Sequence, residues 1–484
     1  MDPITFPTER GLFYGGQWHA PLQGDSRRSI SPATGEDFGA VAIGGPEDMD
    51  AAIAAARTAF PAWRDLTPRA RGLYLRQAAQ VLRDNKTELA RLDAAESGNP
   101  FTAMLKDVDI AADSLDYFAG LAAETKGESI PLGPDAVNFT VREPLGVVGR
   151  IVAFNHPLMF FGAKMGAPLA AGNTVVIKPA EQAPLSSLRF MELIEGLFPP
   201  GVVNLVNGGV DAGRHLVGHA DVAMVGLIGS VPTGRAVMST AARTIKPVML
   251  ELGGKNALIA CPDVEIETVA RGIVAGMNFA WGGQSCGSTS RALIHTDIHD
   301  AVLDRVAELV EAFVPGDPTD PATTMGALIS ADQRDRVLHY IATGKAEGAR
   351  LVTGGQALDG PVPGQGNFVA PTIFADVTPQ MTIAREEIFG PVLSVIRWQD
   401  EDEAMHIAND VEYGLTCSIW TRDLVRAHRL ARKAEAGFVW VNKAGPHFLG
   451  APFGGVKQSG IGREECLGEL LAFTREKNIH IALA

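Results

Sequence analysis

Cys286 and Glu251 are the two side chains whose types and surroundings point most directly to chemistry. Cys286 lies in the stretch GQSCG (283–287), and Glu251 begins the stretch ELGG (251–254) further upstream. Glycine and serine neighbours leave the thiol little to pack against and leave room for a carbonyl group to reach it. A carboxylate on a glycine-flanked turn is suited to act as a general base beside it. With the loops described next, the pair predicts a covalent thiol mechanism coupled to a nucleotide cofactor.

Two loops at the ends of expected strands have the character of nucleotide-binding turns. The stretch GSVPTG (229–234) follows a strand expected to end at residue 227 and precedes a helix expected to begin at Arg235. Backbone amides and the helix dipole at such a turn face a phosphate. In KPAE (178–181), Lys178 and Glu181 could both bind a ribose, and a carboxylate there favours NAD over NADP. For each segment alone, an ordinary turn or a solvated charge pair is the competing interpretation.

A third strand end carries Asn155 in the stretch AFNHP (153–157). A side-chain amide at this place can donate a hydrogen bond to an oxyanion that develops under thiol attack. Taken alone, an asparagine in a turn is more often an ordinary turn residue. The remaining cysteines, Cys261, Cys417 and Cys466, lie in or beside apolar segments and are interpreted as small buried hydrophobic residues.

An alternating fold must bring these loops together. Helical periodicity dominates residues 47–125, and from residue 145 short β-branched runs alternate with helices. This alternation indicates parallel sheets covered on both faces, in two α/β units that meet near residue 250. The expected strands are 147–154, 174–177, 202–206, 222–227, 257–260, 292–294, 392–398, 417–421 and 438–442. The expected helices are 158–171, 185–198 and 302–313. Residues 126–141 are expected to be an extended arm, and residues 354–366 a surface loop.

The composition excludes several classes of protein. The 484 residues carry 42 basic and 56 acidic side chains, a formal net charge of -14. This balance argues against nucleic-acid binding and against an anionic membrane surface. Four cysteines are too few for a disulfide framework, and no CxxC or HExxH spacing appears, so no metal site is predicted. We identify no signal peptide, and the longest apolar stretch, 158–171, is too short to span a bilayer, so the predicted location is the cytoplasm.

Eight motifs together resemble the aldehyde dehydrogenase superfamily in order and spacing, across nearly the whole chain. They are FNHP (154–157), KPAE (178–181), GSVPTG (229–234), ELGGK (251–255), GQSC (283–286), EEIFGPV (386–392), YGL (413–415) and PFGGVKQSG (452–460). Eight ordered motifs are far more specific than any one of them. They favour the functional interpretation over the ordinary turn in each case.

The resemblance implies a role for each matching residue. Cys286 is similar to the nucleophile that forms a thiohemiacetal, and Asn155, with the Cys286 backbone N–H, would hold the oxyanion. Hydride transfer to a nicotinamide would leave a thioester, which Glu251 would hydrolyse as general base. Lys164 matches a lysine near this base. The implied NAD-binding residues are Phe154, Lys178 and Glu181 (the last two at the adenosine ribose), Gly229, Ser230 and Gly234 (pyrophosphate), Glu387 (nicotinamide ribose) and Phe389 (nicotinamide side).

The resemblance also implies the architecture, an α/β fold of two doubly wound open-sheet domains with a β oligomerisation arm. Residues 1–124 and 145–251 would form the NAD-binding domain, and residues 252–458 the catalytic thiol domain. Residues 125–144 and 459–484 would form the arm and the C-terminal strand. We expect the arm to pair with the strand Ile479–Ala482 across a homodimer or homotetramer.

Four positions depart from the common pattern of the family and bear on the substrate. His156 and His447 stand where aromatic residues are frequent, Ala280 stands six residues before the thiol in place of an aromatic, and Ala163 replaces a bulky residue. These changes predict a wider, more polar substrate tunnel and an aldehyde that is bulky, aromatic or polar. In the alternative interpretation, the two histidines are hydrogen-bonded wall residues with no role toward the substrate.

Other functions compete with the hydrolytic oxidation of an aldehyde. A coenzyme A-acylating relative would pass the thioester to a thiol, but Glu251 argues against it because that branch generally lacks a base at this position. A thiol esterase would not need the cofactor motifs. A structural protein on the same fold would not be expected to keep Cys286, Glu251 and Asn155 together. The sequence leaves open which aldehyde is oxidised, whether NADP is also used, and whether the protein is a dimer or a tetramer.

Overall fold

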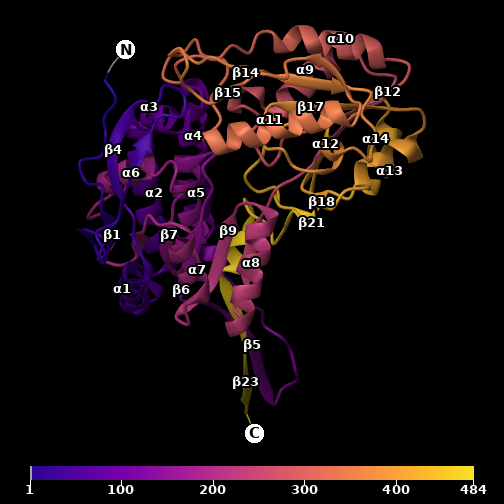
Figure 1. Cartoon of the computed structure of the whole chain (residues 1–484). Helices are drawn as coiled ribbons and strands as arrows, with labels where there is room; N and C mark the ends of the chain where they lie inside the picture. The colour runs from indigo at the N-terminus through magenta and orange to yellow at the C-terminus, as the bar shows by residue number, and fades with distance from the viewer. Residues whose placement is uncertain (1–2, 484) are drawn as a thin grey trace.

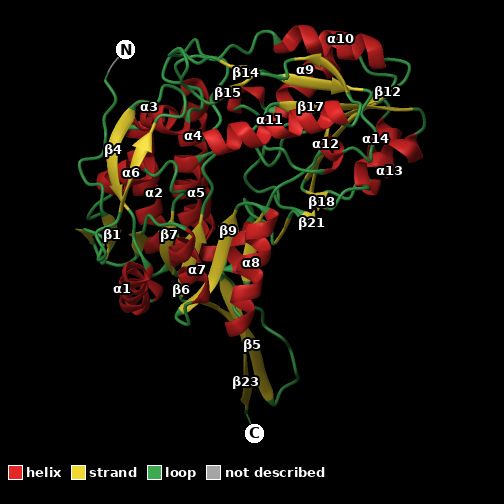
Figure 2. Cartoon of the chain, viewed as in Figure 1, coloured by secondary structure: helices red, strands yellow, loops and turns green. Residues whose placement is uncertain are grey.

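The computed structural model describes residues 3–483 and has an α/β fold built on two large sheets, with a two-stranded arm that projects from the body (Figure 1). This confirms the predicted fold class. Figure 2 shows helices lying against both large sheets. Within residues 3–483, no helix combines the length and apolar character needed to cross a membrane.

The first sheet has eight strands, and its central five run parallel. Its order is β2 (Gln17–His19), β1 (Leu12–Tyr14), β8 (Val203–Leu205), β7 (Thr174–Lys178), β6 (Val147–Ile151), β9 (Val222–Ile228), β10 (Val248–Glu251) and β22 (Gly460–Ile461). Consecutive residues such as Val175 and Val176 pack into different cores on the two faces. Burial on both faces explains the continuous apolar runs in the sequence.

One face of this sheet packs against α1 (Pro46–Arg64), α7 (Val210–Gly218) and α8 (Val231–Ala241). The other packs against α2 (Pro68–Asp84), α3 (Lys86–Ser97), α4 (Phe101–Leu121), α5 (Pro157–Ala171), α6 (Leu185–Leu193) and α15 (Leu467–Ala472). Because β6, β7 and β8 follow one another to one side while β9 and β10 lie on the other, the strand order reverses between β6 and β9. Ligands bind at such a switch point, outside the carboxyl ends of the strands.

The second sheet has seven strands. Its order is β13 (Arg350–Thr353), β16 (Thr372–Ala375), β17 (Val392–Trp398), β12 (Arg291–His295), β11 (Ala257–Ala260), β19 (Thr416–Trp420) and β20 (Phe438–Val441). Its helices are α9 (Ile266–Met277) and α10 (His299–Val310) on one face, and α11 (Ala331–Ala346), α12 (Thr382–Arg385), α13 (Glu401–Asn409) and α14 (Leu424–Lys433) on the other. Only the short connection 252–256 separates β10 of the first sheet from β11 of the second.

Three smaller strand pairs complete the body. They are β3 (Ser26–Ile30) with β4 (Asp37–Ala42), β14 (Ala357–Leu358) with β15 (Phe368–Val369), and β18 (Tyr413–Gly414) with β21 (Val456–Lys457). The sequence did not predict β1 to β4, because these strands are short and β3 is polar and mostly exposed. The loop expected at 354–366 contains the two residues of β14.

Several expected boundaries were wrong. β6 ends at Ile151 rather than residue 154, because its register with β7 and β9 ends there and the chain turns toward α5. α6 ends at Leu193 rather than residue 198. α8 begins at Val231 rather than Arg235, because the Ser230 side chain caps the helix by accepting from the Thr233 N–H.

The arm pairs β5 (Ala136–Pro144) with β23 (Thr474–Ala482) in one antiparallel ladder. Both strands belong to the same chain, so the prediction that they pair across a dimer was wrong. The reason is local. The carbonyl of Phe473, just before β23, accepts a hydrogen bond from the Asn173 side chain, and Asn173 also accepts from the Gly146 N–H just after β5. The two strands therefore leave the body from the same place.

Candidate active site

The predicted nucleophile lies on a loop held by buried side chains. Gln284 donates to the carbonyl of Ala327 at 3.1 Å and accepts from the N–H of Ile329 at 3.0 Å. Asn256, in the connection between the sheets, donates to the Cys286 carbonyl at 2.7 Å. Gly283 has a φ of +70°, and a β-carbon there would collide with the backbone of the loop that follows Phe389. The loop geometry therefore depends on glycine and on two amide side chains.

The Cys286 thiol is protonated at neutral pH. Burial, the Glu251 carboxylate and the Glu387 carboxylate together raise the pKa of Cys286 to about 12. A thiol is a weak nucleophile in its neutral form, so attack on a carbonyl requires a base that takes its proton. Of the two carboxylates, Glu251 contributes more to this rise in the pKa of Cys286 than Glu387 does.

Glu251 ends β10, at the carboxyl edge of the first sheet, and is buried. Neither of its carboxylate oxygens has a hydrogen-bond partner within residues 3–483. Burial, followed by the negative charge of Glu464, raises the pKa of Glu251 well above its usual value, and Lys164 opposes this shift. An unpartnered, desolvated carboxylate costs free energy to bury, and its raised pKa makes it a stronger base. Gly454 leaves room for it, since a β-carbon there would lie 2.7 Å from Glu251 Oε1.

Lys164 lies in α5 and forms a buried ion pair with Glu464 at 2.6 Å, while Arg150 binds the other oxygen of Glu464 at 2.7 Å. Burial acts to lower the pKa of Lys164, but Glu464 and neighbouring carboxylates reverse this and raise it overall. The two cations lower the pKa of Glu464 to about 2 against the effect of burial. Lys164 is therefore permanently charged, and its main partner is Glu464 rather than Glu251.

The residues expected at the adenosine ribose lie where β7 ends. Lys178 is buried, donates to the carbonyls of Pro179 and Gly208, and has a pKa lowered to about 8 by burial. Glu181 is partly exposed and pairs with Arg27 at 3.2 Å. An ammonium and a carboxylate at this strand end fit the hydroxyl groups of a ribose.

The expected phosphate loop lies at the switch point of the first sheet. Gly229 follows β9, and its N–H donates to the Glu251 carbonyl at 3.0 Å, which ties this loop to the residue expected to be the base. Ser230 is the N-cap of α8 and accepts from the Thr233 N–H, and Pro232 has no N–H, so the Val231 N–H and the positive end of the helix dipole are what this turn offers a phosphate. Gly234 lies inside α8, where a β-carbon would come within 2.6 Å of Leu252. Its small size therefore serves close packing of the helix.

The residues expected at the nicotinamide end also meet. Phe154 and Phe389 are in edge-to-face contact, with ring centroids 5.8 Å apart, and Phe389 has a left-handed φ of +57°. Glu387 accepts from the Gly254 N–H at 3.1 Å, and burial raises the pKa of Glu387 to about 7. A β-carbon at Gly253 would collide with the Glu387 carboxylate. Gly253 and Gly254 thus let the Glu387 carboxylate approach the backbone. This carboxylate and the two phenylalanine rings fit the ribose and nicotinamide of a dinucleotide.

His156 and Ala280, two of the residues expected in the substrate tunnel, lie close together. Asn155 is buried, and the Asn99 side chain donates to its carbonyl at 3.0 Å. His156 pairs with the buried carboxylate of Asp107 at 2.7 Å, and its ring lies near Phe160 and Trp281. Burial disfavours the charged ring, but Asp107 outweighs this effect and the pKa of His156 is raised. Ala280 immediately precedes Trp281 in η3 (Phe279–Trp281).

His447 is exposed, on a loop after β20. Its ring stacks on Phe453 with centroids 3.8 Å apart, and Nδ1 bonds Glu465 at 3.2 Å. These contacts fully account for its orientation, which is the outcome expected of a hydrogen-bonded wall residue.

With this geometry in place, comparison with known proteins decides the family. The protein-family model described as "Aldehyde dehydrogenase family" matches residues 18–479. The chain belongs to the aldehyde dehydrogenase family. It is 54% identical to aldehyde dehydrogenase tropH of Talaromyces stipitatus, over 99% of this chain and 94% of that protein. It is 44% identical to a betaine aldehyde dehydrogenase of Sinorhizobium fredii, over 97% of each.

Solved aldehyde dehydrogenases share the fold closely. The NAD+ complex of an aldehyde dehydrogenase from Bacillus cereus matches with a TM-score of 0.95 at 38% identity, covering 98% of this chain and 97% of that chain. The resemblance, the fold class and the reaction class, oxidation of an aldehyde with a nicotinamide dinucleotide, are thereby confirmed. Family members act on aldehydes, so a small-molecule aldehyde is the substrate.

Sequence reasoning missed the partners that set the electrostatics of the site. Glu464 binds Lys164, Asp107 binds His156, and Asn256 holds the thiol loop. Each partner lies 30 or more residues from the residue it binds. Neither spacing nor residue type in the sequence links each partner to the residue it binds, so only the fold reveals the pairing.

Proposed function

We propose that this enzyme oxidises an aldehyde to a carboxylic acid through a thioester on Cys286, with Glu251 as the base that hydrolyses it. The observation that carries the proposal is the state of Glu251. Among residues 3–483 this buried carboxylate has no hydrogen-bond partner, and its charge raises the pKa of the Cys286 thiol. A side chain that costs free energy in this way is typical of a functional site.

The first half of the reaction forms and oxidises the thiohemiacetal. The Cys286 thiol gives its proton to water, and the sulfur adds to the aldehyde carbon. The carbonyl oxygen becomes an oxyanion, which the Asn155 amide and the Cys286 backbone N–H stabilise. The hydride that then leaves the carbon needs an acceptor, which the nicotinamide ring of the bound cofactor supplies. The product on the enzyme is a thioester.

The second half hydrolyses this thioester. Glu251 accepts a proton from water, and the hydroxide adds to the thioester carbonyl and displaces the Cys286 thiolate. Lys164 stays paired with Glu464, and its positive charge opposes the rise in the pKa of Glu251. A coenzyme A-acylating enzyme would need no such base, so the buried position of Glu251 favours hydrolysis.

The cofactor and domain assignments extend this proposal. Residues 1–124 and 145–251 bind the dinucleotide, and 252–458 carry the thiol. Glu181 favours NAD because its charge repels a 2′-phosphate. Arg27, paired with Glu181, is the side chain that would receive a 2′-phosphate if the carboxylate turned away. The cofactor preference is tested by comparing NAD and NADP at matched concentrations.

For the substrate, we propose a bulky or aromatic aldehyde that carries a polar acceptor group. His156 carries the argument, because its ion pair with Asp107 favours the charged ring beside Asn155. A panel of aldehydes tests this by the formation of reduced cofactor. Benzaldehyde-type aldehydes with a hydroxyl or carboxyl group are expected to exceed propanal in kcat/KM. A higher kcat/KM for propanal would contradict the proposed substrate class but not the proposed reaction.

Replacing His156 by phenylalanine should lower kcat/KM for the polar aldehydes about 10-fold relative to unsubstituted benzaldehyde, because one charge-assisted hydrogen bond is lost. The measurement is the ratio of the two kcat/KM values. Asp107→Asn is the matched variant, since it keeps a hydrogen-bond acceptor for the ring and removes the charge. If His156→Phe leaves the ratio unchanged, His156 is only a wall residue.

We further propose that the arm mediates a homo-oligomer, a dimer or a tetramer, and that the enzyme works in the reducing cytoplasm. The arm projects from the body as a two-stranded ladder with Val137 and Ile481 exposed (Figure 1). Such a ladder is marginal alone and has free edges that favour pairing with another chain. All four cysteines are free thiols, as the mechanism requires of Cys286.

Deleting residues 474–484 should convert the oligomer to monomers, because β5 then loses its partner strand β23 and the arm cannot form. Light scattering after size-exclusion chromatography gives the mass directly. Circular dichroism provides the control that the body remains folded. A truncated protein that keeps the mass of the full-length oligomer would show that the subunits associate through another surface.

A further inference from the structure

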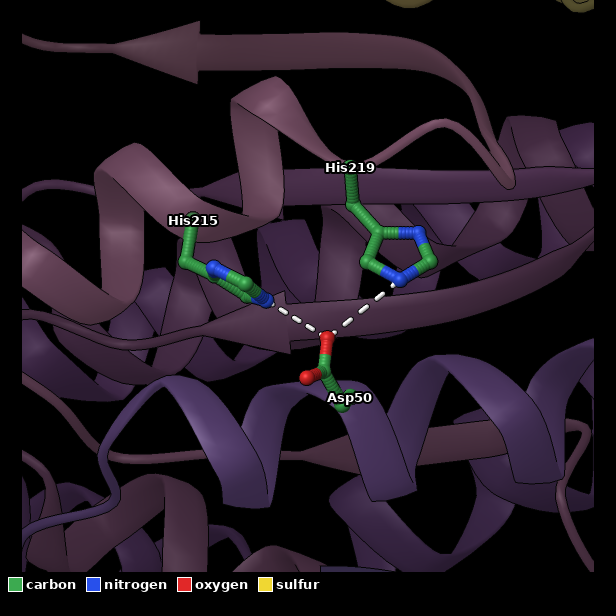
Figure 3. Close-up of side chains that lie close together, drawn as sticks. All are labelled: Asp50, His215 and His219. Atoms are coloured by element: carbon green, nitrogen blue, oxygen red, sulfur yellow. Dashed lines mark hydrogen bonds and ion pairs between the residues drawn. The ribbon is translucent and has the colours of Figure 1, made fainter.

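Asp50, His215 and His219 gather at the junction of two helices on the first sheet, and none of them has a role in the site described above. Asp50 lies in α1, His215 lies in the last turn of α7, and His219 follows the end of that helix. Figure 3 shows both imidazole rings directed at the Asp50 carboxylate. His215 Nε2 and His219 Nε2 lie 2.5 and 3.3 Å from the same oxygen, Oδ1.

This arrangement has the chemistry of a transition-metal site. The two histidines are four residues apart, a spacing that places both side chains on one face of a helix. One ligand atom from each of the three residues lies within 4.8 Å of the others. Two imidazoles and a carboxylate suit zinc, nickel and copper, whereas magnesium and calcium prefer oxygen ligands. Asp50 is exposed, so water can complete the coordination.

The hydrogen bonds of the two histidines show what binding of a metal ion would change. The Asp221 N–H donates to His219 Nδ1 at 3.1 Å, so the neutral His219 ring carries its proton on Nε2. A metal ion bound at Nε2 requires that proton on Nδ1, and the bond from Asp221 is then given up. The Nε2 proton of His215 likewise moves to Nδ1 of its own ring. Binding is therefore weaker than at a closed site with four protein ligands.

We propose that Asp50, His215 and His219 bind one divalent transition-metal ion, with the two imidazole Nε2 atoms and the Asp50 carboxylate as protein ligands and water in the remaining positions. The ion would cross-link α1 to α7. The amino end of α7 adjoins the expected ribose site, since β-carbons at Gly213 and Gly209 would each lie 3.5 Å from Lys178 and Glu181, respectively. The bound ion therefore stabilises a helix that forms one wall of the cofactor site.

The sequence did not predict this site, because no metal-binding motif spans it. The histidines are separated by three residues without a glutamate, and Asp50 lies 165 residues before His215. Only the packing of α1 on α7 brings the third ligand to the histidine pair.

The test uses the untagged full-length enzyme, Ni2+ as the probe, and calorimetric titration at neutral pH. The wild type is expected to bind one equivalent more than His215→Gln/His219→Gln. At a Ni2+ concentration about 100-fold above its Kd, the Tm of the wild type should rise by about 3–5 °C. Asp50→Asn keeps an oxygen acceptor for both rings and removes the charge, so it should weaken binding at least about 10-fold.

The matched control is His406→Gln/His428→Gln, which removes two exposed histidines elsewhere and should keep both the additional equivalent and the rise in Tm. Ni2+ that binds at Cys286 binds equally in every variant, so its contribution to the stoichiometry cancels in the comparison. Equal stoichiometry in the wild type and His215→Gln/His219→Gln, or a rise in Tm that survives this double substitution, would overturn the proposal.

Discussion

Cys286→Ala should abolish aldehyde oxidation, lowering kcat by at least about 10⁴-fold, and should abolish any ester hydrolysis to the same extent. The reason is that both reactions pass through an acyl group on the Cys286 sulfur, and the methyl group of alanine cannot form that bond. The measurements are steady-state formation of reduced cofactor and release of nitrophenol from an activated ester. Cofactor binding, followed by fluorescence, should persist.

The matched control is Cys417→Ala. Cys417 is buried in β19, and burial raises the pKa of its thiol to about 12, the same value as for Cys286. A raised pKa alone therefore does not mark the nucleophile. Its substitution should leave turnover within about threefold of the wild type at temperatures where the variant is folded. Oxidation that survives in Cys286→Ala but not in Cys417→Ala would transfer the assignment to Cys417.

Glu251→Gln should separate the two halves of the reaction. Hydride transfer still occurs once per active site, but steady-state turnover should fall by about 10²- to 10⁴-fold, because no base activates water against the thioester. A stopped-flow trace should show a burst of reduced cofactor followed by a slow phase. Glu96 is a second buried glutamate, and its pKa is raised to about 8. Glu96→Gln makes the same change at that position and should keep normal turnover. Unchanged steady-state turnover in Glu251→Gln would contradict the assignment of the base.

The pH dependence follows from the same residue. Only the ionised carboxylate is a base, and burial raises the pKa of Glu251 well above its usual value. As pH increases through this raised pKa, the ionised fraction grows, so the deacylation rate should increase with pH at values where an ordinary glutamate is already fully ionised. In Glu251→Gln this ionisation should disappear from the profile of the slow phase.

Much of the scaffold was predictable from the sequence because its cores are covered on both faces. Strands such as β7 and β9 are short, continuous apolar runs, and this pattern has few alternatives. The strands β1 and β2 were missed because they have three residues each, and β3 and β4 were missed because β3 is polar and mostly exposed and the pair lies outside the large sheets. The pairing of β5 with β23 was expected between subunits. Nothing in a strand's composition distinguishes a partner in the same chain from one in another.

The sequence was enough to select candidate site residues, but it did not predict the electrostatics around them. Glycine-rich turns at strand ends marked Cys286, Glu251 and Gly229, because these positions need backbone freedom and close approach. The charge state of the site depends instead on Glu464 and Asp107, which reach their partners across the fold. A sequence shows a carboxylate, but its partner is fixed only when the helices and loops are packed.

The most direct measurement is the intact mass of Glu251→Gln after mixing with NAD and an aldehyde that the wild type oxidises. The mechanism predicts a covalent adduct equal to the acyl group of that aldehyde, located on Cys286 by peptide mapping and absent from Glu251→Gln/Cys286→Ala. Unmodified enzyme that nevertheless produces one equivalent of reduced cofactor and free acid would contradict a thioester on Cys286 as the central intermediate.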